Sequence, residues 1–270
     1  MRQEEMSEVL GHIDEAEMVL VGLGEEFDNT REFCREKTYV RGKELLADSL
    51  QSATLPIWQE LFRTERADTG AREGLSALAR CLEKKNYFVV SASVNPVITE
   101  ISWRDGRLVT PCGSGLRLQC GDSCGQNLRP AKPSELKAIE GQLSAWRKAL
   151  ERGDEGEIPI GLGCCPVCGN PVSFNNVYHE HYDENGYLPD WQKYTKWLQG
   201  TLNRRLVILE LGVGMRFPSV IRFPFEKIAY FNQKARFYRV NENLYQMTEE
   251  LATKGVGIAK NAIDWLQNLC

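Results

Sequence analysis

The sequence LVILELGVG, residues 206–214, carries the pattern that decides the fold. Four consecutive apolar residues, 206–209, predict a strand that is buried on both faces, and the glycines at 212 and 214 predict a tight turn directly after it. The sequence MVLVGLG, residues 18–24, shows the same pattern near the start of the chain. Two such strands, each ending in a glycine turn, indicate a parallel sheet of the α/β class.

The segments around these two strands fit the same architecture. Residues 87–90, YFVV, predict another buried strand, and residues 235–240 predict a fourth, mixed one. Apolar residues at helical spacing predict helices in five further regions: 6–13, much of 30–82, 133–152, 191–202 and about 258–269. Buried strands separated by helices predict a Rossmann-like parallel sheet with helices on both faces.

Length and charge limit the protein's class. The chain has 270 residues and a formal net charge of -4, which fits one large α/β domain or one domain with a small insertion. Because there is no basic stripe to neutralise phosphates, we expect no nucleic-acid partner. No run of 18 apolar residues is present and residues 1–16 are polar, so we expect no membrane partner and a cytoplasmic location.

Two short-spaced cysteine pairs predict a structural zinc site. Cys120 and Cys124 form one pair, and Cys165 and Cys168 form the other in the turn Cys-Pro-Val-Cys-Gly. Four thiolates fill the tetrahedral sphere of Zn²⁺ and leave no place for a catalytic water. Cys164 competes with Cys165 for one ligand position, and the common two-residue gap to Cys168 favours Cys165. The alternative is a set of unrelated free cysteines.

The cysteine-rich region also predicts the domain organisation. It interrupts the α/β pattern, so we expect a single domain over residues 1–270 with a small zinc-ribbon module inserted over residues 110–176. The remainder is expected to form the Rossmann-like core.

The glycine turns are candidates for nucleotide binding, because ligands of open α/β sheets bind beyond the carboxyl ends of the strands. The candidate residues lie in the two turns and at the tip after the fourth strand, where an amide could reach a ribose hydroxyl: Gly22, Gly24, Gly212, Val213, Gly214 and Asn241. Glu25 and Glu26 follow the first turn and would compete with a pyrophosphate for backbone N–H groups. Plain strand-to-helix turns are the alternative.

Several of these stretches, in this order, resemble the sirtuin family. The strongest is residues 209–214, LELGVG, followed by Pro218, Pro224 and residues 240–241. The spacing of the cysteine pairs and residues 87–91, YFVVS, agree with it. The chain looks most like the macrodomain-linked sirtuins, which are protein ADP-ribosyltransferases. The resemblance implies a Rossmann-type domain with a zinc-bearing small domain, NAD as cofactor and a protein substrate or partner.

Three sirtuin landmarks are altered in this chain. The Gly-Ala-Gly turn of sirtuins is matched by residues 22–28, GLGEEFD. The Asn-x-Asp triplet is matched by Ser93-Val94-Asn95, and the catalytic His, or Gln in the macrodomain-linked group, by Cys112. Cys112, Ser93 and Asn95 are therefore the candidate catalytic residues. A cysteine could replace the histidine base only as a thiolate, which requires a lowered pKa.

These observations lead to three functional hypotheses. The first is a divergent sirtuin-like protein that binds zinc and NAD or ADP-ribose, with its catalytic residues lost or rearranged. The second is an active NAD-dependent protein ADP-ribosyltransferase or deacylase. The third is an interaction scaffold whose nucleotide cleft is filled by its own side chains.

Overall fold

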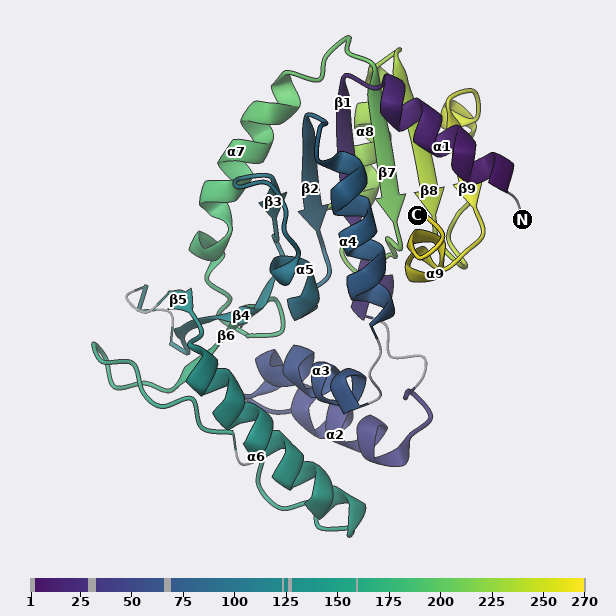
Figure 1. Ribbon diagram of the computed structural model, residues 1–270. Helices are drawn as coiled ribbons and strands as arrows, with labels where there is room; N and C mark the ends of the chain where they lie inside the picture. The colour runs from purple at the N-terminus through teal and green to yellow at the C-terminus, as the bar shows by residue number, and fades with distance from the viewer. Residues whose placement is uncertain are drawn as a thin grey trace.

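The computed structural model describes residues 3–28, 33–65, 69–122, 124–125, 128–158 and 160–269. Its centre is a six-stranded parallel sheet in the order β3-β2-β1-β7-β8-β9 (Figure 1). The strands are β1 (Met18–Leu23), β2 (Tyr87–Ser91), β3 (Leu108–Val109), β7 (Leu206–Leu211), β8 (Ala235–Val240) and β9 (Gly255–Ile258). The strand order reverses direction between β1 and β7, and ligands of doubly wound sheets bind at this switch point.

The two central strands confirm the pattern on which the fold prediction depends. β1 and β7 pair along their whole lengths, with Leu20 opposite Ile208 and Leu23 opposite Leu211. Every residue of both strands is buried. Continuous apolar runs therefore occupy the middle of the sheet, where both faces are covered.

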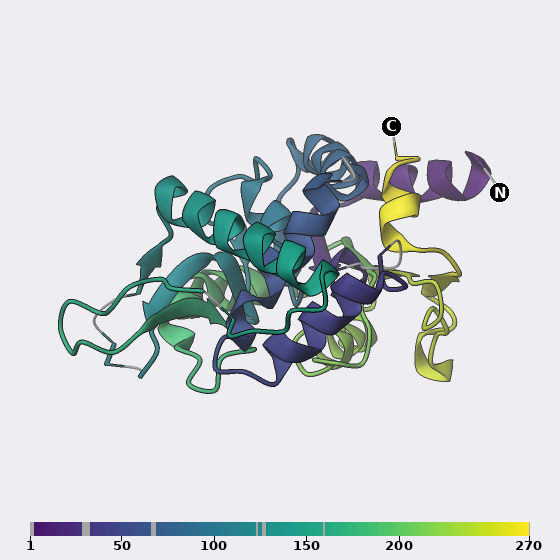
Figure 2. The ribbon, with the colours of Figure 1, turned by 90° about the horizontal axis from the view of Figure 1, so that it is seen from below.

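Helices cover both faces of this sheet (Figures 1 and 2). The face packed by Leu75, Leu78 and Trp265 carries α1 (Gln3–Glu15), α4 (Gly70–Leu82), α5 (Pro96–Glu100) and α9 (Ala262–Leu266). The opposite face, with Tyr194 and Phe225 in its core, carries α7 (Leu188–Gln199) and α8 (Arg222–Phe231). The predicted α/β architecture with two covered faces is confirmed.

A second, smaller unit lies at one end of the sheet (Figure 1). Its three-stranded sheet has the order β5-β4-β6 and is antiparallel, built from β4 (Gly113–Cys120), β5 (Arg129–Pro130) and β6 (Val172–Asn176). Around it pack α2 (Lys37–Ala47), α3 (Leu55–Glu65) and α6 (Pro133–Glu151), joined by one hydrophobic cluster that includes Trp58, Trp146 and Phe174. The boundaries of the inserted zinc module, residues 110–176, stay a prediction. The helices α2 and α3 come before residue 110 in the sequence but pack on the same hydrophobic cluster as β4, β6 and α6.

The C-terminal segment corrects one prediction. The expected helix over about 258–269 is wrong at its start, because residues 255–258 form β9 at the sheet edge and α9 covers only 262–266. Val256 and Ile258 are β-branched residues, which favour extended backbone. Asn261 then begins the helix by accepting hydrogen bonds from the N–H groups of Ile263 and Asp264.

Short 3₁₀ helices complete the described chain: η1 (Glu25–Asp28), η2 (Ser52–Thr54), η3 (Glu184–Gly186) and η4 (Glu249–Leu251). Of all the helices in the described ranges, none combines the length and the apolar character needed to cross a membrane.

Candidate functional site

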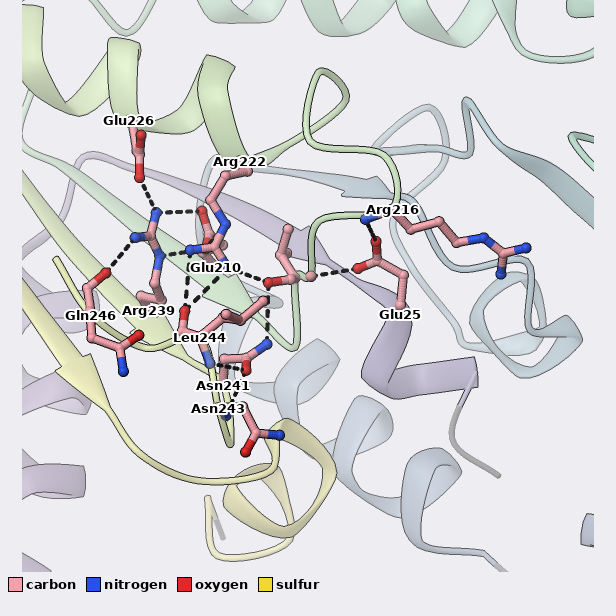
Figure 3. Close-up of polar contacts among 12 residues, drawn as sticks. Glu25, Glu210, Arg216, Arg222, Glu226, Arg239, Asn241, Asn243, Leu244 and Gln246 are labelled. Carbon is pink, nitrogen blue, oxygen red and sulfur yellow. Dashed lines mark hydrogen bonds and ion pairs between the residues drawn. The ribbon is translucent and has the colours of Figure 1, made fainter. Parts of the chain in front are cut away.

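A buried network of charges lies behind the loops that follow β7 and β8 (Figure 3). Glu210, on β7, is 0% exposed. The Nε of Arg239, on β8, donates to Glu210 Oε1 at 2.6 Å, and Arg239 Nη2 donates to Glu226 Oε1 at 2.6 Å. Burial raises the pKa of Glu210, and hydrogen bonds from Arg239 act against that rise.

The two guanidinium groups of this network hold the loops in place. Arg222, on α8, donates to the carbonyl oxygen of Val213 and, at 3.2 Å, to that of Leu244. Arg239 Nη1 donates to the carbonyl oxygen of Gln246 at 2.7 Å. The network therefore fixes residues 212–214 against residues 241–246 at the carboxyl edge of the sheet.

Asn241, predicted to reach a ribose, connects these same loops. Its Nδ2 donates to the carbonyl oxygen of Val213 at 3.2 Å. Its Oδ1 accepts from the backbone N–H groups of Asn243 at 2.9 Å and Leu244 at 2.7 Å. Both ends of the side-chain amide are engaged within the protein.

Glu25 occupies the backbone donors of the turn after β7. Its Oε2 accepts from the N–H of Gly214 at 2.5 Å, and its Oε1 accepts from the N–H of Arg216 at 3.1 Å (Figure 3). Converging backbone N–H groups at such a turn form an anion-binding position. In this chain the anion is the carboxylate of Glu25.

Glu26 makes the equivalent contacts on the other side of the turn. Its Oε1 accepts from the N–H of Glu242 at 2.9 Å, after β8, and its Oε2 accepts from the N–H of Ala262 at 2.7 Å, at the start of α9. The two neighbouring carboxylates therefore hold four backbone donors from three loops. The sequence predicts that these carboxylates compete with phosphate for such donors, but it does not show where either side chain points.

The glycine turns are packed tightly against each other. A Cβ on Gly24 would lie 2.2 Å from Val213 Cα, and one on Gly22 would lie 2.5 Å from Ile221 Cγ2. Gly212 has a φ of +63°, a conformation that favours glycine. Gly22 and Gly24 therefore allow the neighbouring segments to pack closely. Gly212 and Gly214 line the cavity that opens beside the turns.

A cavity of about 340 Å³ opens beside these turns. Four acidic residues line it, together with the glycines, Leu244 and several amides: Glu25, Glu26, Asp28, Glu242, Gly212, Gly214, Asn241, Asn243, Leu244 and Asn261. The Nδ2 of Asn261 is buried without a hydrogen-bond partner in the described part of the chain. A buried donor beside a cavity indicates a place for a ligand acceptor or water.

Asp28 is a candidate functional residue that the sequence patterns did not single out. Its Oδ1 accepts from Ser93 Oγ at 2.5 Å and from the N–H of Val94 at 3.2 Å. Burial raises the pKa of Asp28 to about 6, while the hydrogen bond from Ser93 and the charge of Arg216 act in the opposite direction. A carboxyl group that titrates near neutrality can accept or donate a proton.

Cys112 lies close to this carboxyl group. It is 1% exposed, within the hydrophobic cluster on the α7 and α8 face. Burial, together with the charges of Asp28 and Glu25, raises the pKa of Cys112 to about 12. These conditions favour the neutral thiol and act against the thiolate that a general base requires.

Tyr178 and Arg216 form, with Asp28, Ser93 and Cys112, the polar centre of the candidate site. Arg216 Nη1 donates to Tyr178 Oη at 2.6 Å, and the guanidinium lies 4.6 Å from the centre of the tyrosine ring. Burial and the charge of Asp28 raise the pKa of Tyr178 above its ordinary value. The polar centre thus combines residues from five separate segments, and no motif or residue spacing in the sequence predicts it.

Asn95 has a structural position beside this centre. Its Nδ2 donates to the carbonyl oxygen of Phe27 at 2.7 Å, and its Oδ1 accepts from the N–H of Val97 at 3.0 Å at the start of α5. Ser93 faces Asp28, as described above. The catalytic roles of Ser93, Asn95 and Cys112 stay predictions.

Titration of Asp28 provides a direct measurement of this environment. We expect the side-chain ¹³C carboxyl signal of Asp28 to titrate with a midpoint of about 6, above the ordinary value of 3.8. Because the folded pKa is raised, ionisation opposes folding, so stability falls as the pH rises from about 4 to about 6. Asp28→Asn keeps the acceptor and should remove this fall. A midpoint near 4 would contradict the assignment.

The four predicted zinc ligands come together in the smaller unit. The sulfur atoms of Cys120, Cys124, Cys165 and Cys168 all lie within 4.8 Å of one another. Backbone N–H groups of Cys168 and Val167 lower the pKa of Cys165 to about 7. Clustered sulfurs with a stabilised thiolate fit tetrahedral Zn²⁺, so this cluster could form a zinc site. Cys164 is exposed and lies outside the cluster.

Comparison with solved structures shows the sirtuin fold. A Sir2 homologue mutant in complex with ADP-ribose matches with a TM-score of 0.55 and 14% identity, over 100% of this chain and 95% of that chain. A structure described as the structural basis of sirtuin substrate affinity matches with a TM-score of 0.54 and 11% identity, over 100% and 98% of the two chains. No protein-family model matches the sequence.

Two curated proteins are similar in sequence. A probable bifunctional ADP-ribose hydrolase/ADP-ribosyltransferase of Fusarium oxysporum f. sp. cubense is 29% identical over 147 residues, which are 53% of this chain and 24% of that protein. A protein ADP-ribosyltransferase of Staphylococcus aureus (strain Mu50 / ATCC 700699) is 20% identical over 272 aligned positions, covering 92% of this chain and 82% of that protein. The chain thus spans about a quarter of the first relative.

Proposed function

We propose that this protein is a divergent, zinc-containing sirtuin-like protein that binds NAD or ADP-ribose without the usual sirtuin catalytic residues. The observation that carries the proposal is the set of four backbone N–H groups, from the loops after β7, β8 and β9, that hold two carboxylates. A pyrophosphate is also a pair of linked anions, and such donors recognise either kind of anion.

The relatives support the chemical class of the ligand. Both curated proteins are named for ADP-ribosyl chemistry, and one of the solved structures holds ADP-ribose. A more specific form of the proposal is that this protein is similar to the macrodomain-linked sirtuins. Entry of a nucleotide into this cleft requires Glu25 and Glu26 to leave their donors, because two anions cannot share the same N–H groups.

The test is a calorimetric titration with ADP-ribose and with NAD. The double variant Glu25→Gln, Glu26→Gln keeps the side-chain size but removes two negative charges from the cleft. Hydrogen bonds to charged groups contribute about 1.5 to 3 kcal/mol each, so we expect the variant to bind ADP-ribose at least about tenfold more tightly than the wild type. Glu250→Gln, at an exposed residue outside the cleft, is the matched control and should change nothing.

The possible outcomes separate the candidate functions. Tighter binding by the double variant supports a nucleotide site that its own carboxylates restrict. If neither the wild type nor the double variant binds ADP-ribose, the nucleotide proposal fails, and the protein is an interaction scaffold built on this fold.

An active transferase is the second candidate, favoured by the raised pKa of Asp28 beside Ser93. In that case Asp28 is the group that would accept a proton near neutral pH. With NAD and acceptor protein supplied, we expect Asp28→Asn to abolish turnover and Cys112→Ala to preserve most of it. Turnover that is lost in Cys112→Ala but kept in Asp28→Asn would restore the role predicted for the thiol.

A further inference from the structure

The amino edge of the six-stranded sheet lies at the opposite end of the strands from the glycine turns and the smaller unit (Figure 1). Two cavities open along it, one of about 790 Å³ beside α7 and one of about 410 Å³ beside α1. Glu17 and Arg204 line the first, and their chain neighbours Ala16 and Arg205 line the second. The two cavities therefore adjoin at the starts of β1 and β7, and neither shares a residue with the cavity beside the glycine turns.

Positive charges gather at this edge. Eight cations and three carboxylates line the two cavities, although the whole chain has a net charge of -4. The cations come from five separate segments, so no run in the sequence shows them: Arg107, Lys193, Lys196, Arg204, Arg205, Lys234, Arg236 and Lys254. The carboxylates are Glu15, Glu17 and Asp105. The amino edge is thus a basic surface on an acidic protein, and such a surface attracts anionic partners.

Four of these cations have partners within the protein, which fixes the shape of the edge. Arg204 Nη1 donates to Glu17 Oε1 at 3.0 Å, where the two cavities adjoin. Lys254 Nζ donates to the carbonyl oxygens of residues 229, 230 and 232 at 2.8, 3.1 and 3.3 Å, and so holds the end of α8. The other two ion pairs are Arg205–Glu17 and Lys193–Asp190.

The other four cations, Arg107, Lys196, Lys234 and Arg236, form no ion pair with a carboxylate in the ranges that the structure describes. Arg107 is half-buried in the turn before β3, and the other three side chains are exposed. The guanidinium of Arg107 also makes no hydrogen bond to the described part of the chain, so its five N–H donors are available to a partner. Each cavity therefore presents two cations whose charge the protein itself does not pair.

The residues that line the two cavities favour an acidic peptide over a nucleic acid. Single-stranded nucleic acids stack their bases on exposed aromatic rings. Of the described lining residues only His12 and Trp197 are aromatic, and Trp197 is buried with its Nε1 donating to Asn86 Oδ1 at 2.8 Å. Glu15 and Asp105 lie among the cations and would repel an unbroken row of phosphates, whereas a peptide can place neutral residues opposite them.

We propose that the basic amino edge of the sheet is a docking surface for an extended acidic segment of a partner protein. Carboxylates of that segment pair with Arg107 and Lys196 in one cavity and with Lys234 and Arg236 in the other. The surface does not depend on nucleotide binding, because it lies at the opposite edge of the sheet from the glycine turns. A docked partner therefore leaves that carboxyl edge open.

The experiment measures the binding of fluorescent peptides to the full chain by anisotropy at low salt, where surface charges are least screened. The probe is an octapeptide of alternating Glu and Ser, and its neutral control alternates Gln and Ser. We expect saturable binding of the acidic peptide and none of the neutral one. The fourfold variant Arg107→Gln, Lys196→Gln, Lys234→Gln, Arg236→Gln should weaken binding at least about tenfold, because each exposed ion pair contributes a factor of up to about five.

A matched variant separates this surface from the overall charge of the chain. Lys37→Gln, Lys137→Gln, Lys148→Gln, Arg152→Gln removes the same charge from exposed residues of the smaller unit, outside both cavities. It should bind the acidic peptide as the wild type does, and thermal melting should show that both fourfold variants are folded. Three results would each overturn the proposal: no saturable binding of the acidic peptide, equal weakening by the two variants, or tighter binding of a thymidine oligonucleotide of the same charge.

Discussion

Replacement of Cys165 by Ser is expected to remove the metal from the smaller unit and to unfold that unit. The four clustered sulfurs draw together the end of β4 and the turns before β6. The binding free energy of a structural Zn²⁺ is folding free energy, on the order of 10 kcal/mol at neutral pH. Loss of one thiolate is therefore expected to cost more stability than a typical large-to-small core substitution, which costs about 2 to 5 kcal/mol.

Zinc content and unfolding measure this effect. We expect about one Zn²⁺ per chain in the wild type, loss of most of it in Cys165→Ser, and a lower unfolding midpoint. Cys164→Ser is the matched control, because the neighbouring thiol is exposed and outside the cluster, and it should keep both metal and stability. A stable, zinc-loaded Cys165→Ser protein, or a Cys164→Ser protein without zinc, would show that the assignment of this ligand is wrong.

Replacement of Arg239 by Met is expected to be the second most damaging change. The substitution leaves Glu210 buried, with its nearest cation removed and only Arg222 at 3.5 Å. Breaking a buried ion pair by removing one partner costs about 3 to 5 kcal/mol. Urea unfolding should show a loss of this size, and ADP-ribose binding should weaken as well because Arg239 also holds the carbonyl oxygen of Gln246.

One control changes another arginine on β8, and a second removes both partners of the Glu210–Arg239 ion pair. Arg236→Met changes an exposed arginine on β8 and should cost little. The double variant Glu210→Met, Arg239→Met removes both charges, so it should recover part of the lost stability. If Arg239→Met lost less than about 1 kcal/mol, the network would be shown to contribute little to holding the loops.

The sheet was predictable where burial alone determines a strand. β1, β2 and β7 each contain a continuous run of four apolar residues, and such runs predict buried strands. β4 and β6 contain buried polar residues that hide the pattern. Asn175 Nδ2 donates to Gln119 Oε1 at 2.7 Å, and Asn176 Nδ2 donates to the carbonyl oxygen of Ala53 at 2.9 Å. Those partners lie far away in the sequence, so local patterns give no indication of them.

The same distinction separates the two parts of the candidate site. The cysteine pairs were predictable because two thiolates on one short turn form half of a zinc site. The polar centre was not predictable, because its residues come from five segments that only the fold brings together. Glu25 and Glu26 were recognised as competitors for phosphate, but only the structure shows which backbone donors they bind.

The position of β7 in the middle of the sheet also affects how the chain folds as it is made. β1 and β2 leave the ribosome early, but the neighbour of β1 on the other side is β7, which begins at residue 206. Until then the first half of the sheet has an unpaired edge, and unpaired edges promote aggregation. We therefore expect ribosome-bound chains that end before residue 206 to need chaperones, and longer chains to be released from them.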